Sequence, residues 1–307
     1  MGATSSSEPP KTKEKEYHRF QDLFRSVCDG KPDSKISKEN FVNHFPAEAQ
    51  GLTSRLYDLI SASGNGQPVT VDLCSKTLDR IARTTTSSAQ VQFYLKLFSK
   101  NGEKIAKDDC LELLNTAYYF HSLTSSIKFE STSKDETTLD VITDTILLQA
   151  GVDGCAEWID QNCPDLLTGM HLWLMKKLNG QDISSQSTTL ATIPDGCILN
   201  GILWWVLSST FPSMYSQPSN QGSASNQTHA GDKQSWTSLY TSGEHGLSVN
   251  RFQHHVFSYR GPTVLLITCE DSYSFALAVD TEWRGWNNIM GRSELLLCSD
   301  VSRVQST

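Results

Sequence analysis

The spacing of apolar residues constrains the fold of this chain more than any other feature, because it differs between the two halves. In the first 120 residues, apolar side chains recur three and four positions apart, as on one face of a helix. Beyond residue 235 they gather in short runs such as residues 263–268, which are rich in Val, Leu and Ile and typical of strands. The sequence therefore predicts an α+β protein whose N-terminal half is all helical.

Short amphipathic helices separated by polar turns are expected over residues 17–121. Their apolar stripes are Phe20, Leu23, Phe24 and Val27; Leu52, Leu56, Leu59 and Ile60; Leu73, Leu78 and Ile81; Val91, Tyr94, Leu95 and Phe98; and Leu111, Leu114 and Tyr118. Each polar turn contains one aliphatic residue, as residues 29–37 and 61–69 show. This order of helix, polar turn and helix predicts an EF-hand-like domain.

The turn that begins at Asp29 is a poor calcium loop. An EF-hand loop needs oxygen ligands at its first, third, fifth and twelfth positions. Lys31 stands at the third position and Asn40 at the twelfth, so a cation replaces one ligand and the bidentate carboxylate is missing. We expect calcium-free helix pairs; the alternative is a calcium-responsive adaptor with residual binding at Asp29 and Asp33.

Residues 1–16 are expected to be a disordered tail that carries a lipid. Gly2 follows Met1 and a hydroxyl residue occupies position Ser6, which is the pattern for N-myristoylation of Gly2. The alternative is the same polar tail without a lipid. A single acyl chain holds a membrane only marginally, so the predicted membrane association is reversible.

Polar low-complexity segments divide the rest of the chain. We expect a linker over residues 122–138, a helical extension over 139–180, and a C-terminal domain over 190–307 with a disordered insertion at 216–234. Residues 197–211 are either a buried helix or a strand.

The C-terminal domain is expected to begin with short elements. Residues 235–242 look strand-like, residues 243–246 form a turn, and residues 249–257 are a short helix or an irregular segment. The strand at 263–268 is followed by an acidic turn and the apolar run 274–279. These two runs predict an antiparallel hairpin.

Charge and cysteine usage exclude several classes of protein. A net charge of −8 argues against nucleic-acid binding, because no general basic field is available. The longest apolar runs are shorter than the roughly 20 residues that span a bilayer. The eight cysteines lie singly in apolar surroundings without a Cys-x-x-Cys pair, which indicates reduced thiols in the cytoplasm and no structural metal.

Catalysis finds little support in the sequence. No nucleophile elbow, phosphate-binding loop or dinucleotide fingerprint occurs. His245 is interpreted as a turn residue whose ring hydrogen-bonds the backbone, and His254 and His255 as a solvated face. The sequence favours an interaction protein without cofactor; the alternative is a thiol-dependent antioxidant protein that uses Cys269 or Cys298, although the carboxylates that follow Cys269 disfavour its thiolate.

Two groups of residues in the C-terminal domain resemble the signatures of the TLDc family. The first group comprises Trp236, Leu239, Tyr240, His245, Gly246, Ser248 and Phe252, and the second comprises Pro262, Asp271, Phe275 and Trp283. Ala276 and Ala278 depart from the family pattern, which has glycine and an aromatic residue there. The resemblance implies an antiparallel β-sandwich with flanking helices and no established catalytic residues.

The resemblance also implies partners and a location. TLDc proteins bind the peripheral subunits of the vacuolar proton ATPase and are linked to oxidation resistance. With Gly2 and EF-hand-like helices ahead of the domain, the chain is similar to myristoylated TLDc proteins that are cytoplasmic, peripherally associated with lysosomal membranes and linked to mTOR signalling.

TLDc domains continue with further strands beyond the position of Trp283. We therefore expect a C-terminally incomplete domain, through truncation, alternative splicing or a wrong gene model. A partial sandwich leaves apolar faces and strand edges exposed, which predicts instability and weak partner binding.

Overall fold

The computed structural model describes residues 20–28, 35–124, 133–179, 197–212, 215, 236–268, 273–284 and 293–299. Its helices are α2 (Gln21–Val27), α3 (Lys38–Asn43), the 3-10 helix η1 (Ala47–Ala49), α4 (Gln50–Ser63), α5 (Val71–Ala82), α6 (Ser87–Phe98), α7 (Lys107–Thr124), α8 (Ser133–Leu147), α9 (Gly151–Asn162), α10 (Thr168–Leu178), α11 (Gly201–Thr210), α13 (Ser242–His245) and α14 (Val249–Val256). Its strands are β1 (Thr263–Thr268), β2 (Tyr273–Val279) and β3 (Ser293–Ser299). The α+β prediction is confirmed in these residues.

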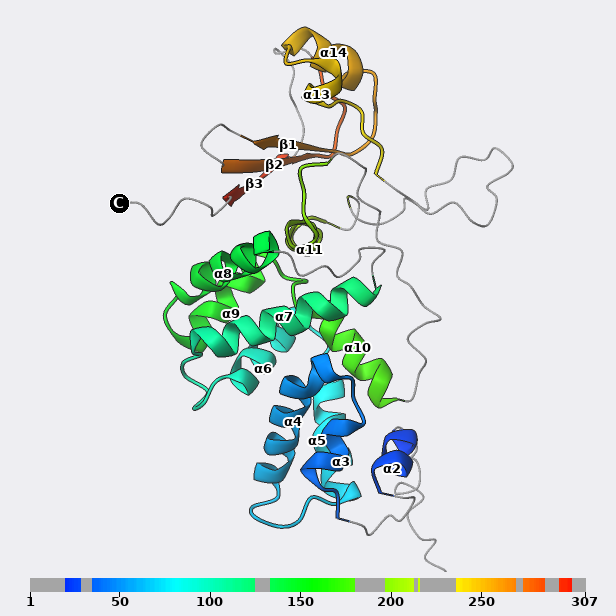
Figure 1. The fold of residues 1–307 in the computed structure, drawn as a ribbon, viewed down its shortest axis with the longest axis vertical. Helices are drawn as coiled ribbons and strands as arrows, with labels where there is room; N and C mark the ends of the chain where they lie inside the picture. The colour runs from blue at the N-terminus through cyan, green and yellow to red at the C-terminus, as the bar shows by residue number, and fades with distance from the viewer. Residues whose placement is uncertain are drawn as a thin grey trace, which may run out of the picture.

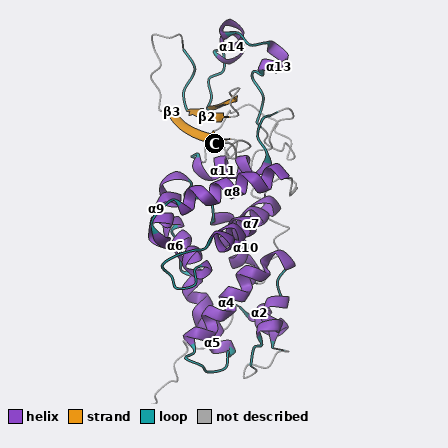
Figure 2. Cartoon of the chain, turned by 60° about the vertical axis from the view of Figure 1, so that its left-hand side comes forward, coloured by secondary structure: helices purple, strands orange, loops and turns teal. Residues whose placement is uncertain are grey.

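The elements follow one another along the long axis of the molecule (Figure 1). Helices α2 to α5 lie at one end, α6 to α10 lie in the middle, and the sheet follows beyond α11. Helices α13 and α14 lie at the far end, and the turned view shows the same order (Figure 2). The helical N-terminal part and the sheet therefore occupy different ends of the molecule.

The first two polar turns are joined through their aliphatic residues. The backbone N–H of Ile36 donates to the carbonyl of Val69 at 2.9 Å, and both side chains are buried. The next residue in each turn caps the following helix: the Ser37 hydroxyl accepts from the N–H of Asn40, and that of Thr70 from the N–H of Leu73. The isolated aliphatic residue in each turn thus connects two helix–turn–helix units.

A similar link joins the turns of the next two units, α6–α7 and α8–α9. The N–H of Val152 donates to the carbonyl of Glu103 at 2.8 Å. Gly151 precedes Val152 with φ +73°, and a Cβ there would lie 3.1 Å from that same carbonyl oxygen. Glycine fits this turn because it has no side chain and adopts positive φ without strain.

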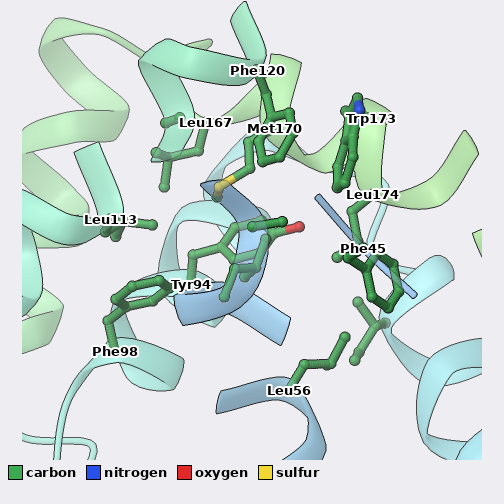
Figure 3. Packing of buried hydrophobic residues seen from close by; sticks show 14 of the residues in the cluster. Phe45, Leu56, Tyr94, Phe98, Leu113, Phe120, Leu167, Met170, Trp173 and Leu174 are labelled. Carbon is green, nitrogen blue, oxygen red and sulfur yellow. The ribbon is translucent and has the colours of Figure 1, made fainter. Parts of the chain in front are cut away.

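Helix α10 packs against α7 and α6, and its Trp173 lies between Phe120 and Phe45 in the core (Figure 3). Its Trp173 stacks on Phe120 of α7, with ring centroids 3.7 Å apart, and lies near Phe45 at 6.4 Å. A hydrogen bond of 2.9 Å joins His171 Nδ1 to the hydroxyl of Tyr94 on α6. These contacts belong to one continuous hydrophobic cluster that runs from Phe20 to Trp205.

The apolar stripes inferred from the sequence form this core. Most of their members are buried, and the exceptions are partly buried and packed against the cluster: Leu59, Leu73 and Leu111. The helical period therefore identified the inward faces correctly, because it depends only on local geometry.

The strands form an antiparallel sheet in the order β1-β2-β3, which confirms the hairpin of β1 and β2. The sequence analysis did not predict β3, although its central residues are Leu-Leu-Leu. Ala276 and Ala278 are buried in one cluster with Leu207 and Phe211 from α11 and its end. Small residues at these positions bring the sheet close to α11.

Several expectations need correction. Helix α7 extends to Thr124 and α8 begins at Ser133, so the interval 122–138 is helical at both ends. His121 and Ser122 in the last turns of α7 are buried, and the ring of Tyr118 lies 5.6 Å from that of Trp205. Residues 197–211, whose apolar run is compatible with a buried helix or a strand, contain helix α11. The strand-like residues 236–241 pair with no strand in the described parts of the chain.

The tail at 1–16 and the insertion at 216–234 lie outside the described residues. In the parts of the chain that are described, no helix combines the length and the apolar character needed to cross a bilayer.

Candidate interaction surface

Trp236 fixes the beginning of the C-terminal signature to helix α11. Its indole N–H donates to the carbonyl of Tyr215 at 2.8 Å. Its ring meets the buried Trp204 edge to face, with centroids 4.5 Å apart. Trp236 therefore holds the start of the following segment against α11.

Tyr240 and His245 stack at the start of the α13–α14 cap, a name we use for residues 236–257. Their ring centroids lie 5.6 Å apart. The Tyr240 hydroxyl donates to the carbonyl of Gly246 at 2.7 Å, and the N–H of Thr241 donates to Nδ1 of His245 at 3.1 Å. The prediction that the His245 ring hydrogen-bonds the backbone is confirmed, although residues 242–245 form the short helix α13 where a turn was expected.

Gly246 and Arg251 shape the turn between α13 and α14. Gly246 has φ +76°, and a Cβ at this position would lie 2.5 Å from Nη1 of Arg251. That nitrogen donates to the carbonyl of His245 at 2.6 Å. Arg251 was missed by the sequence analysis, because its partner is a backbone carbonyl that leaves no side-chain pattern.

Ser248 and Phe252 begin helix α14. Ser248 precedes the helix with extended backbone, and its carbonyl accepts from the N–H of Phe252 at 2.9 Å. The Phe252 ring contacts Tyr240 at 5.5 Å and Trp283 at 5.4 Å, both edge to face. Phe252 therefore links the two signature groups.

Trp283 attaches the cap to the sheet. Its indole N–H donates at 2.8 Å to the hydroxyl of Thr263, the first residue of β1, directly after Pro262. Phe275 lies elsewhere: it stands on β2, opposite Ile267, and is only partly buried. The structure thus brings together Tyr240, His245, Gly246, Phe252 and Trp283 and leaves Phe275 apart from them, whereas Asp271 lies outside the described residues. Gly2 lies outside the described residues.

The histidines of the cap differ from the expected solvated pair. His254 is exposed, but His255 is partly buried, with its ring centroid 4.0 Å from that of His245. Desolvation, followed by the positive charges that His245 and His254 would carry, lowers the pKa of His255. Within the described residues, no three His, Cys, Asp or Glu side chains are grouped to hold a metal ion.

The described cysteines of the core are poor nucleophiles. Burial raises the pKa of Cys74, Cys110 and Cys163 to about 12, so their thiolates are disfavoured. Cys269 and the side chain of Cys298 lie outside the part of the chain that is described.

Two apolar side chains are exposed where the chain passes from α13 to α14. Leu247 is 92% exposed and Val249 is 59% exposed, directly before and after Ser248. The sequence analysis missed both, although an aliphatic residue between Gly246 and Ser248 is an available signal. The cap therefore combines a hydrogen-bonded backbone with two exposed apolar side chains.

Comparison with known families gives one result for this part of the chain. Residues 209–305 match the family model of the TLDc domain. A comparison with curated proteins finds no match. The matched residues begin near the end of α11 and include the cap and the three strands, whereas residues 190–208 of the expected domain precede them. The C-terminal part of this chain, residues 209–305, is therefore similar to TLDc domains.

Proposed function

We propose that this protein is a non-catalytic adaptor that binds the peripheral subunits of the vacuolar proton ATPase through its TLDc domain and supports mTOR signalling at lysosomal membranes. The TLDc match over residues 209–305 carries this proposal. The cap adds support, because its backbone is held by hydrogen bonds from Tyr240 and Arg251 and is suited to present a surface to a partner.

The helical part is proposed to be an EF-hand-like scaffold without calcium. The backbone link from Ile36 to Val69 and the link from Val152 to Glu103 each connect two helix–turn–helix units, as paired EF-hand loops are connected. The antiparallel sheet is proposed to be part of a β-sandwich. Membrane attachment is proposed to come from a myristoyl group on Gly2.

The non-catalytic role is supported by the cap histidines. His245 Nδ1 already accepts a hydrogen bond from the backbone. The rings of His245 and His255 lie against each other and near the ring of Tyr240. Burial raises the thiol pKa of Cys74 and of Cys163 to about 12, which disfavours their thiolates and does not support the antioxidant alternative.

The proposal is tested with the full chain and the purified peripheral sector of the vacuolar proton ATPase. Saturable binding on a biosensor is expected. Hydrogen–deuterium exchange of the complex should then show slower exchange in residues 236–284, because these residues form the proposed contact surface.

Slower exchange confined to residues 35–178 would place the contact on the helical scaffold and contradict an adaptor role for the TLDc domain. A lack of saturable binding would contradict the proposed partner. The antioxidant alternative is tested by adding peroxide and a thiol reductant to the protein and measuring the peroxide that remains. We expect no consumption of peroxide.

A further inference from the structure

We infer that the turn of residues 246–249 is the docking element of this adaptor, and that Leu247 inserts into an apolar pocket on the protein partner. The inference rests on the proposed function and adds the contact residue. We call residues 246–249 the Leu247 turn.

Exposure of two neighbouring apolar side chains is the first observation. Leu247 and Val249 are 92% and 59% exposed, whereas the apolar residues further along α14 turn inward: Val256 is buried and Phe252 contacts Trp283. Single exposed apolar residues are common on protein surfaces. Exposure alone therefore does not identify a docking element. The backbone of the Leu247 turn gives a second, independent reason.

The backbone of this turn is held in place from both sides. The carbonyl of Gly246 accepts from the Tyr240 hydroxyl at 2.7 Å, and its N–H donates to the carbonyl of Ser242 at 2.9 Å. The carbonyl of His245 accepts from Arg251 at 2.6 Å. A side chain presented by such a turn loses little conformational entropy on binding, so its apolar area contributes more fully to affinity.

Charge around the turn favours a protein pocket over a lipid surface. Peripheral membrane anchors combine an apolar tip with free Lys or Arg side chains that bind anionic headgroups. Within residues 236–261 the cationic side chains are Arg251, which binds the carbonyl of His245, and Arg260, which lies 3.6 Å from the carboxylate of Glu282. Both are directed to groups of the protein itself.

The position of the turn allows a large partner to approach. Helices α13 and α14 lie at the end of the molecule opposite α2 to α5 (Figure 1). A partner can therefore cover the Leu247 turn without contacting the helical scaffold.

The test compares Leu247→Ser with Leu148→Ser in the full, unlipidated chain. Leu148 is 83% exposed and lies just after α8 in the helical part, so it is a matched control. Leu247→Ser should weaken binding to the purified peripheral sector of the vacuolar proton ATPase by about tenfold or more, because a buried leucine contributes that much to affinity. Leu148→Ser should bind as wild type, and both variants should keep the wild-type melting temperature.

Each other outcome has a distinct meaning. Wild-type affinity in Leu247→Ser would overturn the inference and leave the proposed function intact. A wild-type chain that does not bind would contradict the proposed function, and the inference with it. Sedimentation with vesicles of phosphatidylcholine and phosphatidylserine that is lost in Leu247→Ser would assign the turn to a lipid surface and also overturn the inference.

Discussion

Gly246 occupies a backbone position that glycine adopts without strain, and the side chain of Arg251 fills the space beside it. The positive φ of +76° disfavours residues that carry a Cβ, and such a Cβ would lie 2.5 Å from Arg251 Nη1. Position 246 therefore requires glycine for two reasons, the positive φ and the close approach of Arg251. Both reasons concern the conformation of the Leu247 turn.

Gly246→Ala should destabilise the cap by about 1–2 kcal/mol, because it strains the backbone and displaces Arg251. Hydrogen exchange of residues 236–256 is expected to accelerate. Gly243→Ala is the control, since Gly243 lies in α13 with open space around it and without positive φ. Equal exchange in the two variants would show that the turn tolerates a side chain at position 246.

His171 makes the stability of the helical part depend on pH. Burial lowers its pKa from 6.5 to about 4 in the folded protein, so the unfolded chain binds a proton more readily. The stabilisation is therefore present above pH 6.5 and is lost as pH falls towards 4. At pH 4.5 the loss should amount to about 2–3 kcal/mol for this one group.

Urea unfolding of wild type and His171→Gln at pH 7.5 and pH 4.5 tests this expectation. The variant removes the titrating ring, and its stability should fall less on acidification. His121, whose pKa burial also lowers to about 4, remains in both proteins and contributes equally. The same loss in both proteins would mean that His171 does not contribute to the acid sensitivity.

At the scale of elements, the polar turns act as connections between helix pairs. Ile36 and Val69 meet through their backbones, and Glu103 and Val152 repeat this contact in the next pair. These contacts use backbone groups and buried aliphatic side chains, neither of which requires a metal ion.

Calcium should therefore leave the stability of the protein unchanged. Melting curves of the full chain in calcium and in chelator are expected to coincide, because Lys31 and Asn40 replace two of the ligands that a calcium loop needs. Magnesium at equal ionic strength is the control. A calcium-specific rise of more than a few degrees would contradict the prediction, because ligand binding to the folded state raises its stability.

At the scale of the whole molecule, the first described helix and the Leu247 turn lie at opposite ends. Helix α2 belongs to the end formed by α2 to α5, and α13 and α14 form the other end (Figure 1). Under the proposed function, membrane attachment near the N-terminus leaves the TLDc-like residues 209–305 free to contact a partner away from the attachment point.

Myristoylation of Gly2 gives a direct test of that attachment. Coexpression with an N-myristoyltransferase should raise the intact mass by one myristoyl group and produce partial sedimentation with vesicles. Gly2→Ala should show neither change. An unmodified wild-type mass under these conditions would remove the lipid from the proposed function.

Much of the fold could be predicted from local patterns. The apolar stripes, such as Val91, Tyr94, Leu95 and Phe98, predicted which faces of the helices are buried. The runs at 263–268 and 274–279 predicted the hairpin, and the hydrogen bond between the His245 ring and the backbone was predicted correctly, although His245 ends helix α13. The end of α7 could not be predicted, because its polar residues 121 and 122 are buried by packing that has no local sequence pattern.

The sequence by itself determined the secondary-structure period and the residues of the TLDc signature, since both depend on neighbours along the chain. Tertiary structure alone decided that α10 packs against α6 and α7, that Phe252 joins Tyr240 to Trp283, and that Leu247 is left uncovered. The physical reason is that periodicity defines one apolar face for each element. Which distant face covers it is set by the packing of the entire chain.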